Sequence, residues 1–543
     1  MTSISCNPPA IVPQQTDAAH SRSTADVQTS PSWAPLTWFQ RWPVIITGVI
    51  LLVATVPNLP PGVCFSDSGD LQLASATLGI MHPPGYPGYV AIGYLLTRVP
   101  GVEPAYVISL ASLAVGIVAL LLTVLLAVRL GVNAWAAAAM VLLLTADSHL
   151  WDHLVAPEVY TPSLALLVGS SYLLVKYARL GRRRDLYWAA FLFGLVVSNR
   201  PTAFYAFPFF VLAWWYAGRQ WELSGRRSAR ILGMAALCAA LPGVFALSFL
   251  WIRDAKTTEY NYIEHNNAEV HIHPDAETGF AAKARRVYWH ITAREFTRYM
   301  GNTARGTYVR LRWMFNQFFL YRMVDLFGIP ILVGPLTFLL LVPIFWIGGV
   351  WVYRRCRVTF WLMIGLVVGN ALFIVTYRIF GQAADLTPAM VASAIFLAAG
   401  TASLFDENKT PRRRFAVALL IALSISTLFD APRRGPRKSQ DATGFIAGVD
   451  LASLPPRSVI CSTWRESTAL WYAMIVQTRR TDISVINTIP NEWPERIERL
   501  DDRPLFAIAD LPEVAAYRPT PYREHLWQLH RPVGSQDSHS YRP

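Results

Sequence analysis

Charged side chains are scarce in this chain. Among its 543 residues, 15% are Asp, Glu, Lys or Arg and 53% are hydrophobic. Since about a quarter of the residues in an average soluble domain are charged, a surface that is exposed to water on all sides is excluded. The composition therefore indicates an integral membrane protein.

Cysteine is also rare. The chain has five, at positions 6, 64, 238, 356 and 461, and no two of them have the Cys-x-x-Cys spacing. A zinc or redox motif based on cysteine is therefore excluded. Cys64 and Cys461 fall on the same predicted side of the membrane, where either two free thiols or a disulfide would fit.

Acidic residues are outnumbered, with 35 Asp and Glu against 48 Lys and Arg. In a soluble protein this excess would suggest a nucleic-acid partner. Here the basic residues gather in short loops between apolar runs, near residues 182–184, 226–230, 354–357 and 412–414. That is the pattern of cytoplasmic loops in membrane proteins, so we exclude nucleic acid as a partner.

Long apolar runs fill the middle of the chain, and a helix of about 20 apolar residues spans a bilayer. Eleven runs are predicted to be transmembrane helices: 43–59, 105–128, 133–150, 161–178, 186–199, 202–217, 230–251, 328–352, 358–376, 387–404 and 414–429. With this number, every basic loop falls on one side. The N-terminus is then cytoplasmic and the chain beyond residue 430 is extracytoplasmic.

Three regions follow from this pattern. Residues 1–42, which begin with a stretch rich in Ser, Thr and Pro, are expected to be a disordered cytoplasmic tail. Residues 43–429 form an α-helical polytopic transmembrane domain with large outer loops at 60–104 and 252–327. Residues 430–543 are predicted to be a small soluble α/β domain, because three short strands alternate with helices and no Gly-rich phosphate loop opens a helix.

Asp67 and Asp70 stand at the start of a predicted helix in the first outer loop. Leu71, Ala74 and Leu78 give this helix an apolar stripe, so we expect a short amphipathic helix on the membrane surface. Two interpretations of the carboxylates are open. They form a capping pair at the helix N-terminus, or one of them is a general base that takes the proton of an attacking hydroxyl.

Further polar residues lie in the same loop and in the next outer loop. His82, which like Tyr86 belongs to a proline-rich turn, either caps the helix end or donates a hydrogen bond to a phosphate or a sugar hydroxyl. Glu158 and Tyr160 stand at the start of an apolar span, where a carboxylate is a functional candidate by default. The neighbouring Trp151 is expected in the aromatic belt at the membrane interface.

Two arginines are candidates for binding a lipid phosphate. Arg200 follows Asn199 in the short outer hairpin between the fifth and sixth spans, where its planar guanidinium suits a phosphate or a partner such as Glu158. Snorkelling to the interface is the alternative. Arg378, in a later outer loop, is either a second phosphate contact or the partner of Asp385 in a surface ion pair.

Several motifs in the outer loops resemble those of a family of bacterial membrane proteins. The motifs are DSGD at residues 67–70, Leu-Gly at 78–79 and HPPGYP at 82–87, and later matches at 151–160, 194–200 and 454–487 follow in the same order. That family is related to the eukaryotic protein O-mannosyltransferases that act on the IPT domains of plexins and receptors.

The resemblance implies a GT-C type fold and a polyprenyl- or dolichyl-phosphate hexose donor, which is mannose in the eukaryotic members. It also implies an acidic base in the first outer loop, for which Asp67 is the first choice. Asp70 stands where the family more often has Glu, as a second contact or a metal ligand. Arg200 replaces a His that is common in the family.

The predicted function is therefore a membrane glycosyltransferase that moves a hexose from a polyprenyl-phosphate donor to a hydroxyl of a protein or a glycan. We expect a bacterial inner membrane, with the C-terminal domain in the periplasm. No cofactor is required by the motifs, although Asp67, Asp70 and Glu158 carry the oxygen ligands that Mg²⁺ or Mn²⁺ prefers. His271 and His273 lack a further ligand and are expected in a solvated loop.

The alternative function is a transporter or flippase of lipid-linked envelope precursors. Transporters usually place their binding residues near the middle of the bilayer. The candidate residues of this chain all fall on one membrane face, which favours an enzyme at the membrane surface.

Overall fold

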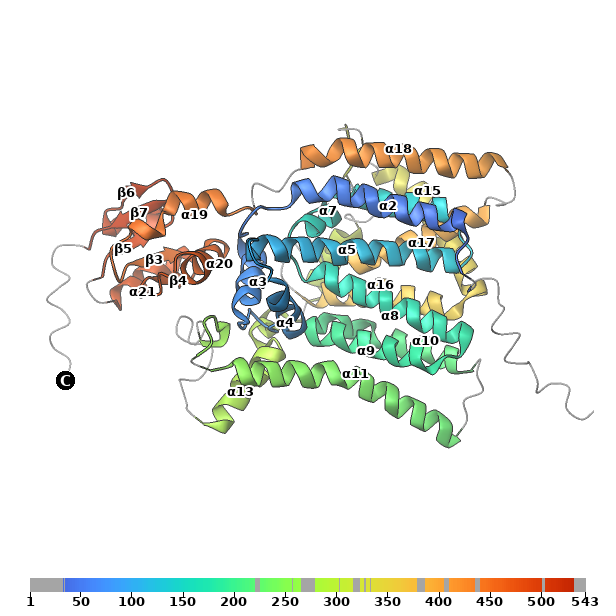
Figure 1. Ribbon diagram of the computed structural model, residues 1–543, viewed down its shortest axis with the longest axis horizontal. Coiled ribbons are helices and arrows are strands. Elements are labelled where there is room, and N and C mark those ends of the chain that lie inside the picture. Colours follow the sequence, from blue (N-terminus) through green and yellow to red (C-terminus); the bar gives the residue numbers. More distant parts are fainter. Residues whose placement is uncertain are drawn as a thin grey trace, which may run out of the picture.

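A computed structural model shows a body of long helices with a smaller unit at one end that contains a sheet (Figure 1). The structure describes residues 33–531 apart from 34, 220–224, 256, 265–278, 302, 316–322, 327–328, 333, 378–385, 405–409, 435–439 and 501–502. The long helices of the body run side by side along the longest axis of the molecule. Their two ends therefore form two separate surfaces, one of which adjoins the sheet.

Every predicted span falls on a helix of the body. These helices are α2 (Trp38–Thr55), α5 (Pro104–Arg129), α6 (Ala134–Thr145), α8 (Tyr160–Leu180), α9 (Arg183–Asn199), α10 (Phe207–Arg219), α11 (Gly225–Arg253), α15 (Gly334–Arg355), α16 (Arg357–Thr376), α17 (Thr387–Leu404) and α18 (Thr410–Arg434). Within the described residues, four stretches are long and apolar enough to cross a membrane: Trp38–Asn58, Pro104–Arg129, Ser228–Arg253 and Arg357–Thr376. A total of eleven spans stays a prediction.

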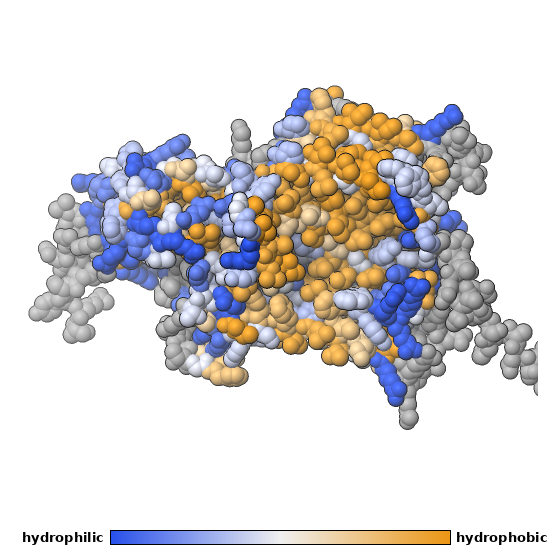
Figure 2. Space-filling model, viewed as in Figure 1, coloured by the Kyte–Doolittle hydropathy of each residue, from blue (hydrophilic) through white to orange (hydrophobic). Residues whose placement is uncertain are grey.

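The surface of the body is apolar between two polar ends (Figure 2). Large apolar side chains such as Val53, Leu237 and Val244 are more than half exposed on it. Water would disfavour so large an exposed apolar surface, whereas lipid chains accept it. The chain is therefore an integral membrane protein.

Basic loops of the body lie together. The Arg179 guanidinium donates a hydrogen bond to the backbone carbonyl of Arg355 at 2.7 Å, and Arg355 in turn donates to the carbonyl of Leu130 at 3.4 Å. The turns that follow α5, α8 and α15 thus meet at one end of the body. This agrees with the prediction that these loops share one side; which membrane face that is stays a prediction.

The first outer loop contains α3 (Ser66–Thr77) and α4 (Pro87–Leu96). The prediction of an amphipathic helix on the membrane surface is wrong, because α3 is buried on several sides: Leu71, Leu73 and Gln72 are at most 1% exposed. The helix ends where Leu78 adopts a left-handed conformation, and the next amide, of Gly79, donates back to the carbonyl of Ala74 at 2.8 Å.

Shorter elements complete the body. They are η2 (Val56–Asn58), α7 (Ser148–Val155), η3 (Pro201–Ala206), α13 (Phe280–Ile291), η4 (Arg294–Tyr299), α14 (Ala304–Phe315) and the antiparallel pair β1 (Met323–Leu326) and β2 (Ile329–Leu332). Of these, α7 and α13 lie toward the same end of the body as α3 and α4 (Figure 1).

The C-terminal unit is an α/β structure around a five-stranded sheet. Its elements are α19 (Thr443–Val449), η7 (Leu451–Ser453), β3 (Val459–Ser462), α20 (Trp464–Tyr472), η8 (Ala473–Gln477), β4 (Ser484–Asn487), η9 (Pro490–Glu492), α21 (Trp493–Glu498), β5 (Leu505–Ala507), η10 (Pro512–Tyr517), β6 (Thr520–Arg523) and β7 (Leu526–Leu529). The strand order is β4-β3-β5-β7-β6.

The predicted three parallel strands are present, because β3 pairs in parallel with both β4 and β5. The prediction missed the hairpin of β6 and β7, which adds two antiparallel strands beside β5. Strand β6 is mostly exposed and reads Thr-Pro-Tyr-Arg, so it lacks the apolar alternation that reveals a half-buried strand.

The C-terminal unit and the first outer loop share one hydrophobic core. Phe65 and Leu71 of the loop belong to the same buried cluster as Leu470 of α20 and Phe506 of β5. The backbone amide of Phe65 also donates to the carbonyl at position 440 at 2.8 Å. The C-terminal unit is therefore packed onto α3 through a continuous core.

Gly69 provides the first test of this packing. A Cβ atom there would lie 2.2 Å from the carbonyl oxygen of Cys64 and 2.9 Å from the hydroxyl of Thr468 in α20. Gly69→Ala would therefore clash with the backbone of Cys64 and crowd α20, and we expect it to lower the free energy of unfolding by about 1–3 kcal/mol. Thermal unfolding in detergent measures the change.

Gly444→Ala is the matched control, because Gly444 lies in α19 and nothing lies within 4 Å of a Cβ built there. Alanine favours a helix over glycine by about 0.5–1 kcal/mol, so this variant should be slightly more stable than the wild type. Equal unfolding temperatures for the two variants would contradict the close packing at Gly69.

Candidate functional site

The end of the body that adjoins the sheet carries a buried carboxylate, Asp70. It is 0% exposed. One of its oxygens accepts hydrogen bonds from the backbone amide of His82 at 2.9 Å and from the His82 ring Nδ1 at 2.5 Å, and the other accepts from the Tyr260 hydroxyl at 2.6 Å. Asp70 thus holds the imidazole in a fixed orientation.

The capping interpretation of the two aspartates is wrong. Helix α3 begins at Ser66 after Phe65 at the N-cap, and no side chain caps it. Asp70 instead bonds to groups outside the helix, and Asp67 lies in the first turn without bonding to the helix amides. The helix geometry therefore leaves Asp67 available for chemistry.

His82 lies between the two carboxylates. Its Nδ1 is bonded to Asp70, and its Nε2 faces the Asp67 carboxylate at 4.0 Å. Burial lowers the pKa of His82, but the charge of Asp67 and the hydrogen bond and charge of Asp70 outweigh burial and raise this pKa to about 9. At neutral pH the ring is therefore a cation.

Asp67 is the exposed carboxylate of the pair. Its side chain is 52% exposed, and one of its oxygens accepts a hydrogen bond of 2.7 Å from the indole N–H of Trp464 in α20. The other oxygen faces His82. Of the two aspartates, only Asp67 is open to a ligand, so it is the one that can exchange a proton with a substrate.

Glu158, from the outer loop that follows the third predicted span, joins this cluster. One of its oxygens accepts a hydrogen bond of 3.0 Å from the hydroxyl of Ser68, the residue that follows Asp67. Burial and then the negative charge of Asp67 raise the pKa of Glu158 to about 8, although Ser68, His82 and Arg200 oppose the shift. The site thus holds a carboxyl group that is largely protonated at neutral pH.

Arg200 and the aromatic residues around it form the wall of the site that faces the helical body. The guanidinium lies over the Tyr160 ring, 4.5 Å from its centroid, and Arg200 is 8% exposed. Tyr86 packs edge-on against His82, with ring centroids 5.4 Å apart. Burial and the charge of Asp67 raise the pKa of Tyr86 far above its ordinary value, so its phenol stays protonated.

Asn199, also predicted to bind substrate, contacts the protein itself. Its side-chain oxygen accepts hydrogen bonds from the amides of Gly88 and Tyr89 at 3.2 and 3.3 Å, and its NH₂ group donates to the carbonyl of Leu195. The amide group satisfies the free N–H groups at the start of α4. In this structure Asn199 therefore fixes α4 and, with it, the turn that carries His82.

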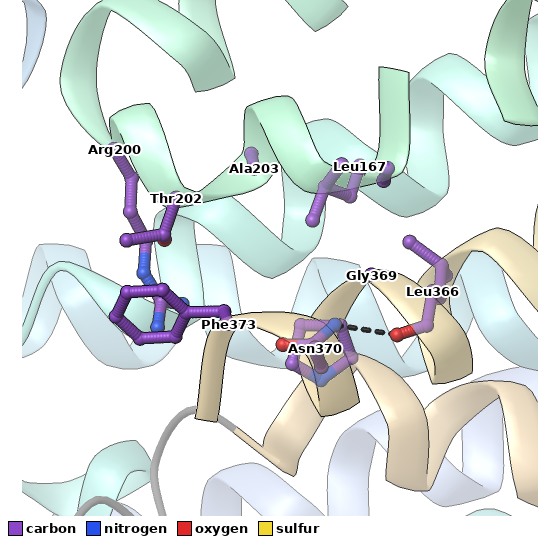
Figure 3. A pocket seen from close by; sticks show the side chains of 10 residues that line it. Leu167, Arg200, Thr202, Ala203, Leu366, Gly369, Asn370 and Phe373 are labelled. Atoms are coloured by element: carbon purple, nitrogen blue, oxygen red, sulfur yellow. Dashed lines mark hydrogen bonds between the residues drawn. The ribbon is translucent and has the colours of Figure 1, made fainter. Parts of the chain in front are cut away.

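A narrow pocket lies beside Arg200 (Figure 3). Arg200 and Thr202 line it at one end. Residues of α8, η3, α16 and α17 form the rest of the wall, which is apolar except for Asn370: Leu167, Ala203, Ala206, Leu366, Gly369, Asn370, Phe373 and Pro388. The pocket therefore joins a cation to an apolar surface inside the helical body.

Candidate residues were predicted in four outer loops, and the structure brings three of these loops together. Asp67, His82, Glu158 and Arg200 lie in one cluster, linked by the contacts and charges described above. Arg378, Asp385, His271 and His273 lie outside the described residues. Trp151 is not in an aromatic belt as predicted, because it is 1% exposed and packs in the core of the body.

Five residues of the site were missed in the sequence. They are Tyr260, Tyr262, His290, Glu295 and Trp464, from the long outer loop and from α20. Trp464 follows the carboxyl end of a parallel strand, the edge of α/β sheets at which ligands commonly bind, so its position was a usable signal. Nothing in the loop sequence distinguishes the others from ordinary aromatic and polar residues.

Within the part of the chain that the structure describes, no three His, Cys, Asp or Glu side chains are grouped so that they could hold a metal ion. Asp70, one of the three predicted oxygen donors, has both carboxylate oxygens engaged by His82 and Tyr260.

The match to a known protein family covers the loops that form the site. Residues 67–224 match the model of the family described as protein O-mannosyl-transferase TMEM260 N-terminal domain. This region contains Asp67, Asp70, His82, Glu158 and Arg200. The resemblance to O-mannosyltransferases is thereby confirmed for the segment that carries most of the site. No curated protein matches the chain in sequence.

Solved structures match the whole fold. ArnT from Cupriavidus metallidurans bound to undecaprenyl phosphate superposes with a TM-score of 0.53, at 11% identity, over 91% of this chain and 99% of that chain. ArnT in the apo state gives a TM-score of 0.50, at 10% identity, over 90% and 97%. The predicted GT-C-like fold is therefore confirmed.

Glu158 and His82 predict how stability depends on pH. Their pKa values lie above the ordinary values of 4.5 and 6.5, so both groups bind protons more tightly in the folded chain. Such stabilisation is complete at low pH and is lost as the pH rises, for Glu158 between about pH 4.5 and about pH 8. Glutamine mimics the protonated carboxyl group.

We therefore expect Glu158→Gln to unfold at the wild-type temperature near pH 5 and about 2 °C above it near pH 8.5. Thermal unfolding in detergent over this range measures the difference. The control is Glu259→Gln, which removes an exposed carboxylate 3.6 Å from Arg479 and should leave the pH dependence unchanged. A Glu158→Gln variant that gains no stability at high pH would contradict the assignment.

Proposed function

We propose that this protein is a glycosyltransferase. It moves a hexose from a polyprenyl-phosphate donor to a hydroxyl of a protein or a glycan, on the extracytoplasmic face of the membrane. The observation that carries the proposal is the pairing of the exposed Asp67 carboxylate with a cationic His82 that the buried Asp70 orients. Its position at the junction between the apolar body and the C-terminal unit suits a donor with a lipid tail and a polar head.

Asp67 supplies the base in the proposed reaction. An acceptor hydroxyl is a poor nucleophile until a positioned carboxylate takes its proton. The acceptor oxygen then bonds to the anomeric carbon of the donor sugar while the bond from that carbon to the phosphate oxygen breaks. The proton ends on Asp67 and the leaving group is polyprenyl phosphate.

His82 and Arg200 supply the positive charge. The phosphate oxygen gains negative charge as its bond to the sugar breaks, and fixed cations in a partly dry site stabilise that charge strongly. His82 is charged at neutral pH, and the Arg200 guanidinium has the planar geometry that suits phosphate oxygens. Arg200 stands in place of the His that is common in the resembled family, and a guanidinium stays charged at neutral pH.

The pocket beside Arg200 supports a lipid donor. A phosphate at Arg200 would place the first prenyl units against the apolar wall formed by residues such as Leu366 and Phe373. The related fold of ArnT has been solved with undecaprenyl phosphate bound. The donor sugar would then extend from the phosphate toward Asp67, because Glu158 bonds to Ser68, next to Asp67, and Arg200 lies over Tyr160, two residues after Glu158.

The membrane orientation is part of the proposal. Basic loops gather at the end of the body opposite to the site, and such loops are usually cytoplasmic. The site and the C-terminal unit then face the outside, which in a bacterial inner membrane is the periplasm. A mannose donor is the first to test, given the family match of residues 67–224.

Asp67→Asn tests the base. The variant keeps the size and hydrogen-bonding oxygen of the side chain but cannot take the proton at neutral pH, so we expect kcat to fall by about 10²–10⁴-fold with little change in donor KM. Release of polyprenyl phosphate from radiolabelled polyprenyl-phosphate mannose or glucose, with a protein and glycan extract as acceptor, measures turnover.

The control for this experiment is again Glu259→Gln, which removes a carboxylate on the same face but outside the cluster. Equal turnover of the wild type and Asp67→Asn would exclude Asp67 as the base. Binding of donor without its consumption by the wild type would instead support the transporter alternative.

Arg200→Gln tests the phosphate site. Loss of the guanidinium should weaken the binding of polyprenyl phosphate about tenfold or more, because a charged hydrogen bond contributes about 1.5–3 kcal/mol. Titration calorimetry in micelles measures the dissociation constant. Arg179→Gln, whose guanidinium bonds to a backbone carbonyl at the opposite end of the body, is the control. Equal affinities of the two variants would place the phosphate elsewhere.

A further inference from the structure

Trp464 is the residue of the C-terminal unit that reaches the proposed base. It is the first residue of α20, immediately after strand β3 and Thr463. Its indole N–H donates the hydrogen bond of 2.7 Å to one oxygen of Asp67. The two residues are 397 positions apart in the sequence, so the contact exists only because the C-terminal unit packs onto α3.

The plane of this indole is fixed by its neighbours. The ring of Trp464 meets those of His82 and Tyr262 edge-on, at centroid distances of 5.7 and 5.8 Å and interplanar angles of 87°. The ring of Trp471, two turns further along α20, packs against it at a centroid distance of 6.2 Å. An indole held from three sides presents its N–H in one direction, toward Asp67.

An exposed aspartate needs such a contact to act reproducibly. The Asp67 side chain is half exposed and would otherwise be free to change its rotamer. Indole is a donor that cannot accept a proton, so it fixes one carboxylate oxygen without competing for the proton of the acceptor. The second oxygen, on the side of His82, stays available to the acceptor hydroxyl.

We propose that Trp464 is a positioning residue of the transferase site, and that the C-terminal unit completes this site rather than only adjoining it. The inference rests on the proposed function, because positioning matters only if Asp67 acts as the base. A merely structural Trp464 would stabilise the packing of the C-terminal unit and leave the chemical step unchanged.

Trp464→Phe separates these roles, because it keeps an aromatic ring and removes the N–H. We expect kcat to fall about tenfold and the donor KM to stay within about twofold of the wild type. The matched control is Trp493→Phe, which removes a buried indole N–H that donates to the carbonyl of Thr488 at 3.1 Å within the same unit. That variant should lose stability but keep kcat.

A second measurement does not need turnover. Asp67→Ala and Trp464→Phe remove the two ends of one hydrogen bond, so their effects on the unfolding temperature should not add. We expect each variant to unfold roughly 1–2 °C below the wild type. The double variant should unfold no lower than the less stable of the two.

The outcomes are distinct. If the wild type transfers sugar and Trp464→Phe transfers it equally fast, the proposed function stands and the positioning role falls. Additive shifts in the unfolding temperature would exclude the contact itself. If the wild type transfers no sugar from any polyprenyl-phosphate donor, the proposed function falls, and coupled unfolding temperatures would then leave Trp464 with a docking role alone.

Discussion

The hydrogen bonds of Asp70 hold three parts of the chain in register. This carboxylate lies in α3, while its partners His82 and Tyr260 come from the proline-rich turn and from the loop after α11. A buried carboxylate is costly to leave unsatisfied, so the three segments must meet before it can be buried. The orientation of His82, and through it the surroundings of Asp67, depend on that one side chain.

The position of this network explains its chemistry. The helical body needs apolar side chains wherever it meets lipid, and the C-terminal unit has an ordinary polar surface (Figure 2). Between them lies a zone that is dry enough to shift the pKa values of Glu158 and His82 and open enough to expose half of Asp67. Groups there interact more strongly than in water and still meet ligands from both phases.

Sequence patterns predicted the parts of this structure that local chemistry determines. Apolar runs located the long helices, and alternating strands and helices located β3, β4 and β5. The sequence also predicted that Asp67, His82, Glu158 and Arg200 lie on one face of the membrane, because the loops that carry them connect predicted spans on that face. Burial of α3 did not follow, since its covering helix α20 lies nearly four hundred residues later. The contact of Trp464 was hidden for the same reason.

The shared core of α3 and the C-terminal unit has a consequence for biosynthesis. Residues 66–77 are synthesised nearly four hundred residues before the helix that covers them, α20. Until then the apolar side of α3 has no partner, and chains that are held in this state are prone to associate wrongly. A nascent chain thus cannot assemble the environment of Asp67 until α20 has been made.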